Sequence, residues 1–370
     1  MTVKICLIGG GGACISANYQ IQSAMKEKVE FVLISKTDTF HFEIASVRGV
    51  VDSSMAKDMF IPYTNLFNES KGRVIHGSPK SIDDKKVIMQ DNSVIEFDFL
   101  VIGTGIKYPA PFRTSKLTKS EGIKEFEAIA SDVKKSKHIV IVGGGPVGVE
   151  VCGEIMTDYS DKRVTLIHHG AQLIPGDFKP KFKNRVYQEL LNRNVTVLLN
   201  TKAENMKDYI PNALEKGWAT GQLKVKLSDG RLVDCDMIIN ATGNGKPNTE
   251  FVSLTNALDE REYVKVKSTL QLENFNHIFA CGDCCNYDYY KLAVVAQPQG
   301  KQVGNNIVAL INHKPLKAAK KYNPQFIAVS LGRTGGVLQL IFIWGNWVTA
   351  FLKSKTLFID STWKFLKVKK

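Results

Sequence analysis

A glycine-rich turn in the middle of the chain has the residue types and spacing to hold a phosphate. Gly143, Gly145 and Gly148 follow a branched apolar run at residues 139–142 and precede a predicted helix over residues 149–156. In this spacing the first glycine permits a tight turn, the second lets backbone approach a pyrophosphate, and the third lets the helix pack against its strand. The helix N-terminus adds free amides for the phosphates. The stretch predicts a dinucleotide-binding site.

The beginning of the chain carries a second copy of this pattern. An apolar strand runs into Gly9, Gly10, Gly11, Gly12 and Ala13. Two departures follow: Cys14 stands at the third-glycine position, and Ser35 ends the next strand, where an acid usually binds a ribose hydroxyl. Cys14 is small enough to tolerate close packing. In the later copy the equivalent strand ends in His168, so we expect weak discrimination against a 2′-phosphate and a site-lining histidine rather than a catalytic base.

The elements that must position these loops are also duplicated. Both copies continue through a predicted hairpin, with turn signals at residues 91–92 and 229–230, and return as an apolar strand that ends in Thr-Gly at residues 104–105 and 242–243. A repeat on this scale indicates two nucleotide-binding units rather than two similar loops. The sequence therefore predicts an α/β fold with two Rossmann-like domains and two bound dinucleotides.

Two charged side chains lie near these loops in the sequence. Arg48 falls in a segment, residues 39–57, that looks helical. It is either a solvated helix residue or a guanidinium held near a cofactor phosphate or ring system. Glu150 follows the last fingerprint glycine by two residues. Its carboxylate is stabilised by the helix dipole in any case, and it could also pair with a lysine or orient a nicotinamide carboxamide.

A third motif decides which family this architecture resembles. Residues 276–283 form an apolar strand that ends in Gly282-Asp283. Together with the duplication, this resembles the two-dinucleotide flavoprotein reductases of the pyridine nucleotide–disulfide oxidoreductase superfamily, and within it the apoptosis-inducing-factor-2-like group that includes ferroptosis suppressor protein. The resemblance covers nearly the whole chain. It implies FAD at the first fingerprint and NAD(P)H at the second, in a domain inserted within the FAD domain.

The resemblance also implies roles for individual residues. It places FAD contacts on Gly9 to Ala13, Arg48, Val74 and Asp283, and a capping role of Asp283 for the next helix is compatible with that contact. The NAD(P)H site would contain Gly143, Gly145, Gly148 and His168. Catalytic roles fall on Glu150 and Lys353, and Phe358 belongs to the substrate side. No metal site is expected.

The resemblance divides the chain into three parts. Residues 1–112 and 244–316 would form the FAD domain, residues 113–243 the NAD(P)H domain, and residues 317–370 a small C-terminal α+β region with possible membrane contact.

The seven cysteines allow a different chemistry to be weighed. Their irregular spacing in a chain of this length favours a reducing compartment over a disulfide framework. Cys281 and Cys284 have CxxC spacing but flank the FAD aspartate, whereas Cys14 stands alone in its helix. A dithiol mechanism needs a thiolate pair that faces flavin and substrate. We therefore favour direct hydride transfer from nicotinamide to flavin, followed by electron transfer to an acceptor.

Two glutamines could meet that acceptor. Residues 296–300 resemble the alanine–glutamine motif near the quinone of type II NADH dehydrogenases. Gln297 and Gln299 could bond a quinone carbonyl or the flavin pyrimidine edge, or they could cap the following helix.

The C-terminal region has an apolar helical pattern of its own. Trp344, Trp347, Val348, Phe351 and Leu352 follow helical spacing. Such a helix could be a core element that covers the flavin. It could instead be an interfacial helix, flanked by lysines, on anionic lipid.

Composition sets the remaining expectations. The net charge of +13 favours anionic partners, but no nucleic-acid-binding motif is present. The start lacks a signal-peptide pattern, position two is threonine, and no uncharged apolar run is long enough to span a bilayer. We expect a cytoplasmic protein, peripheral on an intracellular membrane if on any, and a monomer or weak dimer.

The predicted function is FAD-dependent NAD(P)H oxidation with a quinone-type acceptor. The alternative is a redox-responsive cell-death factor that binds nucleic acid through its basic surface.

Overall fold

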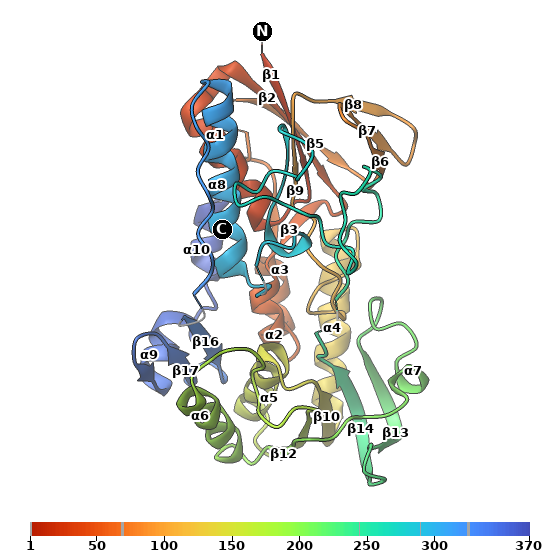
Figure 1. The fold of residues 1–370 in the computed structure, drawn as a ribbon. Helices are drawn as coiled ribbons and strands as arrows, with labels where there is room; N and C mark the ends of the chain where they lie inside the picture. Colours follow the sequence, from red (N-terminus) through yellow and green to blue (C-terminus); the bar gives the residue numbers. More distant parts are fainter. Residues whose placement is uncertain (1, 68–69, 244, 289, 324–325) are drawn as a thin grey trace.

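The structure is a computed structural model that describes residues 2–67, 70–243, 245–288, 290–323 and 326–370. Two five-stranded sheets and a smaller three-stranded sheet organise the chain (Figure 1). The α/β fold with two Rossmann-like units is therefore confirmed. The predicted domain boundaries stay a prediction, and residue 244 itself lies outside the described residues.

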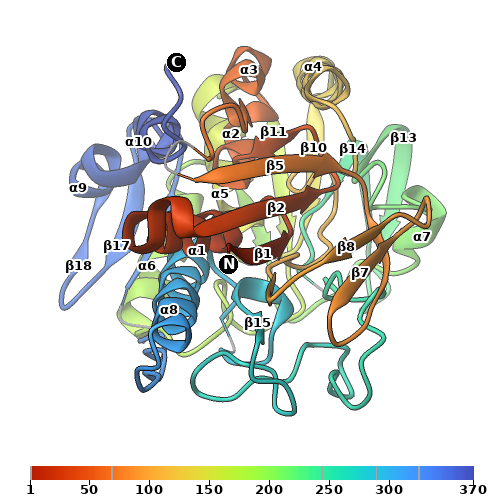
Figure 2. The same cartoon turned by 90° about the horizontal axis from the view of Figure 1, so that it is seen from above.

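The first sheet combines strands from both ends of the proposed FAD domain. Its order is β15-β9-β1-β2-β5, and every neighbouring pair is parallel. Its strands are β1 (Val3–Ile8), β2 (Val29–Ser35), β5 (Lys71–His76), β9 (Phe99–Ile102) and β15 (Ile278–Ala280). Helices α1 (Gly12–Met25) and α8 (Ala293–Ile311) pack together beside it (Figures 1 and 2). Parallel strands leave their carboxyl ends at one edge, which is where such sheets bind ligands.

The second sheet is built in the same way from the middle of the chain. Its order is β12-β11-β10-β14-β13, with β13 antiparallel at the edge. Its strands are β10 (His138–Val142), β11 (Arg163–Ile167), β12 (Thr196–Leu198), β13 (Trp218–Lys226) and β14 (Leu232–Asn240). Helices α5 (Pro146–Asp158) and α6 (Pro180–Leu191) belong to this unit, and α7 (Met206–Tyr209) precedes its hairpin. Every residue of β10 is buried, as expected for a central parallel strand.

Helix α4 (Lys119–Lys135) leads from the first unit into the second (Figure 1). A capping box fixes its start: the Thr118 hydroxyl accepts a hydrogen bond from the Glu121 amide, and the Glu121 carboxylate accepts one from the Thr118 amide. A small antiparallel sheet of the first unit comprises β6 (Pro79–Ile82), β7 (Lys86–Met89) and β8 (Val94–Glu96). Its turn at Asp91-Asn92, and the turn at Asp229-Gly230 in the second unit, lie where the sequence predicted them.

The C-terminal region forms the third sheet and two short helices. It comprises β16 (Ile327–Ser330), β17 (Gly336–Gln339), β18 (Ile343–Trp344), α9 (Asn346–Thr349), a π-helical turn over Ala350–Ser354, and α10 (Ile359–Phe365). One continuous helix through residues 344–352 was expected, and that expectation is wrong. Trp344 belongs to a strand, and the turn after α9 is wider than an α-helix.

A second predicted helix, over residues 39–57, also proves to be broken up. The segment contains the short strand β3 (Thr39–His41), which pairs with β4 (Phe60–Pro62), and the single turns α2 (Ser46–Gly49) and α3 (Ala56–Met59). Phe40, Phe42, Val47 and Val50 of this segment are all buried in the core. Tertiary packing has overridden local helical periodicity here.

Candidate functional site: two dinucleotide loops joined by buried ion pairs

A cavity of about 640 Å³ opens at the carboxyl ends of the first sheet. That volume lies within the range typical of ligand sites. Its walls come from the first glycine loop, the ends of β2 and β5, the turn after β9, and the loop after β15. Among the residues that line it are all five of the predicted loop contacts, Asp283 and Gln297. The structure therefore brings these predicted cofactor contacts together around one opening, and their contact with a cofactor stays a prediction.

The glycines of the first loop are required by contacts with the neighbouring strand. Gly9 has φ +109°, and a Cβ there would lie 2.5 Å from the carbonyl oxygen of Gly103. A Cβ at Gly11 would have no protein atom closer than 3.9 Å, so the space beside Gly11 is free for a ligand. Tyr63 donates a hydrogen bond to the Gly10 carbonyl and lies 3.2 Å from the Ser35 hydroxyl. Ser35 thus helps to hold the loop, in the place where related sites carry an acid.

A cluster of charged side chains in this cavity had no signal in the sequence. The Arg113 guanidinium lies 2.5 Å from the Glu43 carboxylate and 3.6 Å from that of Asp283. Burial raises the pKa of the Glu43 carboxyl, and Arg113 opposes that shift. Arg113 and Glu43 are seventy positions apart, so only the tertiary fold brings them together. The cluster supplies polar groups beside the predicted FAD aspartate.

The second loop repeats this geometry. Gly143 has φ +119°, and a Cβ there would lie 2.5 Å from the Ala241 carbonyl oxygen. A Cβ at Gly148 would lie 1.9 Å from the Gly143 oxygen, whereas a Cβ at Gly145 would have nothing within 4 Å. The open space at Gly145 adjoins the N-terminus of α5, as a bound pyrophosphate requires.

His168 supports this loop rather than facing open solvent. Its Nδ1 accepts a hydrogen bond from the Gly144 amide at 3.2 Å, and only 5% of the residue is exposed. Burial lowers the pKa of His168, and neighbouring His169 adds to that effect. A neutral ring that accepts a backbone hydrogen bond is a positioning group, so the structure gives His168 no feature of a base.

Glu150 and Lys353 form a largely buried ion pair. The Lys353 ammonium lies 2.6 Å from Glu150 Oε1 and also donates to the Ala328 carbonyl. The same carboxylate oxygen accepts hydrogen bonds from the amide and hydroxyl of Ser330. The pair joins helix α5 to the C-terminal region, across 203 positions of the sequence. Neither residue lines the cavity described above.

Arg48 forms a second buried ion pair one helical turn further along α5. Its guanidinium binds both carboxylate oxygens of Glu154, at 2.8 and 2.9 Å, and donates to the carbonyls of Ser354 and Lys355. Arg48 is 2% exposed and Glu154 is fully buried. Because its donors are engaged here and it does not line the cavity, the predicted contact with flavin has no support in the structure. Arg48 instead ties the first unit to α5 and the C-terminal region.

The other predicted contacts divide between the cavity and the protein interior. Gln297 lines the cavity, but Gln299 is buried, accepts a hydrogen bond from the Gly282 amide and donates to Asp288. Gln299 therefore supports the loop that carries Asp283. Val74 lies within β5, paired with Leu33 and away from the cavity lining. Phe358 is 38% exposed at the start of α10, also outside that lining.

Comparisons with known proteins decide the family. The model of the family described as pyridine nucleotide-disulphide oxidoreductase matches residues 3–300. The chain belongs to this family. Ferroptosis suppressor protein 1 of Mus musculus is 30% identical over 370 residues, which covers 99% of this chain and 96% of the relative. Apoptosis-inducing factor homolog A of Dictyostelium discoideum is 30% identical over 374 residues, which covers 96% of this chain and 90% of the relative.

Solved structures show the same fold. The sulfide:quinone oxidoreductase of Aquifex aeolicus superposes with a TM-score of 0.74 and 18% identity, covering 99% of this chain and 92% of that chain. The predicted cofactors and the predicted resemblance are confirmed: this is a flavoprotein oxidoreductase that uses FAD and NAD(P)H. When bound, the flavin accepts a hydride from the nicotinamide and passes the electrons on.

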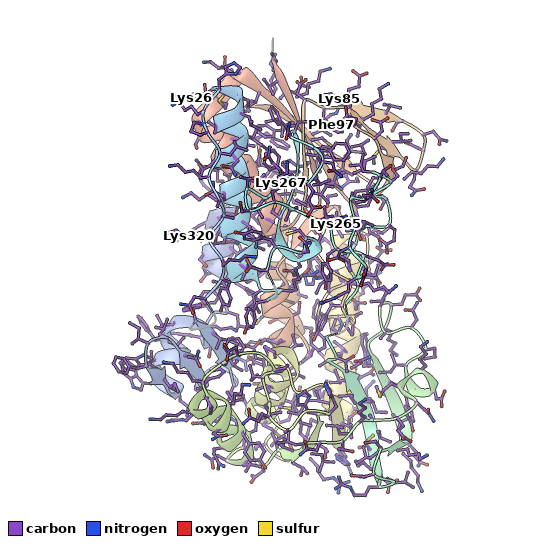
Figure 3. The ribbon with its side chains drawn as sticks, in the orientation of Figure 1. Lys26, Lys85, Phe97, Lys265, Lys267 and Lys320 are labelled. Carbon is purple, nitrogen blue, oxygen red and sulfur yellow. The ribbon has the colours of Figure 1, made fainter. Side chains whose placement is uncertain are left out.

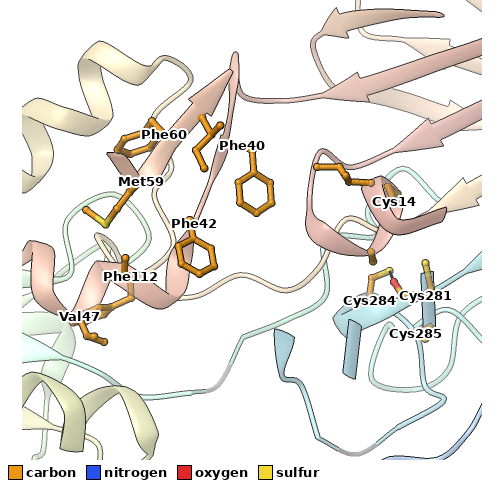
Figure 4. Packing of buried hydrophobic residues seen from close by; sticks show 14 of the residues in the cluster. Cys14, Phe40, Phe42, Val47, Met59, Phe60, Phe112, Cys281, Cys284 and Cys285 are labelled. Carbon is orange, nitrogen blue, oxygen red and sulfur yellow. Dashed lines mark hydrogen bonds between the residues drawn. The ribbon is translucent and has the colours of Figure 1, made fainter. Parts of the chain in front are cut away.

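The family is named for a disulphide, but the cysteines of this member do not favour dithiol chemistry. All seven are free and buried. Figure 4 shows Cys281, Cys284 and Cys285 close together, with Cys14 near them. Burial raises the pKa of the Cys281 thiol well above its usual range, and neighbouring thiols add to the effect. Burial also raises the pKa of Cys284. Such thiols are poor nucleophiles at neutral pH, which favours direct flavin chemistry.

Lysines of the first unit are spread over several elements. Figure 3 labels Lys26, Lys85 and Lys267, which come from separate segments of that unit. This spread adds no structural support to the nucleic-acid alternative, which stays a prediction.

Proposed function

We propose that the protein oxidises NAD(P)H through FAD and reduces a quinone-type acceptor. The observation that carries the proposal is the buried Glu150–Lys353 pair, which joins the NAD(P)H unit to the C-terminal region at 2.6 Å. Reduction of a quinone to a quinol by NAD(P)H consumes one further proton. A buried ammonium in contact with a carboxylate can hold that proton and release it at Lys353 Nζ.

The remaining residues support this assignment by what they hold in place. Ser330 donates two hydrogen bonds to the Glu150 carboxylate, which fixes the partner of the ammonium. Gln297 offers its amide to the cavity, where it can bond a carbonyl oxygen of the acceptor. The raised pKa values of the thiols favour a route that does not pass through cysteine.

The relatives add a physiological context. The names ferroptosis suppressor protein and apoptosis-inducing factor homolog describe those proteins. We propose that this chain likewise acts on a cell-death process through its redox activity. The ion pair supports the quinone proposal, whereas only the names of the relatives support the cell-death link.

The test separates the two halves of the reaction. Purified FAD-loaded Glu150→Gln and Lys353→Met variants should keep their flavin and its reduction by NADH. Quinone-dependent turnover should fall by at least about a hundredfold, as general acid–base catalysis would require. Lys364→Met, which removes an exposed lysine on α10, is the matched control and should turn over like the unchanged protein. Normal quinone turnover in Lys353→Met would overturn the proposal.

A further inference from the structure

The C-terminal region exposes a set of large apolar side chains that the interior does not use. The four most exposed large hydrophobic residues in the described chain are Phe351 (82%), Trp347 (77%), Ile341 (75%) and Phe342 (69%). Trp344 and Leu352 are exposed as well. All six fall within residues 341–352, and together they are called the apolar tip. Exposed apolar residues are normal when scattered, but a group of aromatics in one short segment marks an interaction surface.

The helical part of the apolar tip has its polarity reversed. Over residues 346–354 the polar side chains point inward: Asn346 accepts a hydrogen bond from the Gly336 amide, and Thr349 and Ser354 are fully buried. The apolar Trp347, Phe351 and Leu352 point outward. A helix of a soluble domain has the opposite arrangement, so this face is built to meet an apolar medium.

The charges around the apolar tip are basic. Residues 338–358 contain no aspartate or glutamate, and their charged residues are Lys353, engaged with Glu150, and Lys355, which is exposed. Lys179 donates to the Ile341 carbonyl at 2.7 Å. Arg185 lies beside Gly345, and its partner Glu189 is largely buried and shared with Arg193 and Asn346.

We propose that the apolar tip inserts into the interfacial region of an anionic lipid bilayer. Aromatic side chains favour that depth, and neighbouring lysine and arginine side chains are attracted to anionic headgroups. A second copy of the chain is a poorer occupant, because it would bring the basic flanks of two molecules with net charge +13 together. In the described parts of the chain, each helix is too short or too polar to span a bilayer.

The apolar tip is directly connected to the ion pair. Within the π-helical turn Ala350–Ser354, Phe351 and Leu352 face outward, while the next residue, Lys353, contacts Glu150. Docking would therefore bring the bilayer close to the Glu150–Lys353 pair, to which the proposed function assigns the proton transfer.

Vesicle binding of the FAD-loaded full chain tests the proposal without any acceptor, so its result is independent of the quinone assignment. Vesicles of phosphatidylcholine with phosphatidylserine should bind the protein in flotation assays. Pure phosphatidylcholine and high salt should weaken binding. The Trp347→Glu/Phe351→Glu variant should bind at least about tenfold more weakly. Leu232→Glu, which changes an exposed leucine at the start of β14, beside the hairpin turn of the second sheet, is the matched control and should bind unchanged.

A measurement on the unmutated protein guards against a variant that fails to fold. Brominated lipids quench tryptophans that enter the bilayer, and they should quench the unmutated protein but not Trp344→Phe/Trp347→Phe. Undiminished binding by a folded, flavin-containing Trp347→Glu/Phe351→Glu variant would overturn the proposal. So would a dimer in sedimentation that this variant dissociates while vesicle binding persists.

Discussion

The two dinucleotide units differ in which residue lacks a side chain where the helix after the glycine loop meets the neighbouring strand. In the second unit the third glycine is present, and Ala241 stands opposite it on the turn after β14. In the first unit Cys14 replaces that glycine, and Gly103 stands opposite it after β9. A Cβ on Gly103 would lie 2.6 Å from the Cys14 sulfur. In the second unit the larger residue, Ala241, lies after the strand, and in the first unit the larger residue, Cys14, lies on the helix. The two segments are in contact in both units.

This difference shows what the fingerprint specifies. At the helix–strand contact each unit has one residue without a side chain, Gly148 on the helix or Gly103 on the strand side, and Gly148 also packs against the Gly143 carbonyl oxygen. Gly9 and Gly143 do not vary in this way, because both have positive φ and a Cβ on either would lie 2.5 Å from a carbonyl oxygen. A sequence motif that requires glycine at the helix position, where this chain has Cys14, misses the glycine that stands opposite it, Gly103.

The largest expected effect separates the two units by cofactor. Gly11 and Gly145 have φ values of −83° and −76°, and a Cβ at either position would meet no protein atom closer than 3.9 Å, so valine should fold there. Gly11→Val should lose flavin altogether. Gly145→Val should retain flavin, while its kcat/KM for NADH falls by at least about a hundredfold. Flavin absorbance and stopped-flow reduction measure the two outcomes. The same loss in both variants would contradict the division of cofactors.

A second experiment asks whether Arg48 contacts the flavin or joins the first unit to helix α5 and the C-terminal region, a contact called the junction here. Arg48→Met and Glu154→Met should each destabilise the protein by about 3–5 kcal/mol, because each leaves a buried charge without its partner. The double variant should cost less than the sum of the two. Chemical denaturation at fixed FAD concentration measures these effects. If Arg48→Met loses flavin and Glu154→Met does not, Arg48 is a flavin contact after all.

A third experiment makes the first unit resemble the second. Gly103→Ala alone should destabilise by about 1–3 kcal/mol, the usual cost of overpacking, because the new methyl group meets the Cys14 sulfur. Adding Cys14→Ala removes that sulfur and should restore most of the loss in the same denaturation assay. A Gly103→Ala variant as stable as the unmutated protein would show that the contact is not tight.

The smallest effect concerns the strand ends. His168 stands where an acid would bind the ribose 2′-hydroxyl, so NADPH and NADH should be used with similar kcat/KM. His168→Asp should lower kcat/KM for NADPH relative to NADH by about tenfold, through repulsion of the 2′-phosphate. Steady-state kinetics with both cofactors give the ratio. A strong preference for NADH in the unmutated protein would show that another group reads that position.

The parts of this molecule that were predictable are those governed by local rules. Glycine spacing, buried strands and the two hairpin turns depend on neighbouring residues, and the structure has them where they were expected. The junction was not predictable in that way. Arg48 and Glu154 are 106 positions apart, and both are ordinary helix residues until the units pack together.

The two failed helix predictions have a related cause. Residues 39–57 and 344–352 carry helical spacing of apolar residues, but that spacing does not say which side is buried. In the first segment the apolar side chains are buried although the chain forms no continuous helix, and in the second the most exposed apolar side chains belong to the apolar tip.

The central claim is that the two loops hold two cofactors that react with each other and then with a quinone. Anaerobic titration of the purified protein with NADH, followed by addition of a quinone, tests it directly through the flavin absorbance. The account predicts that the oxidised flavin band bleaches with NADH and returns with the quinone. A flavin band that NADH leaves unchanged would contradict the account.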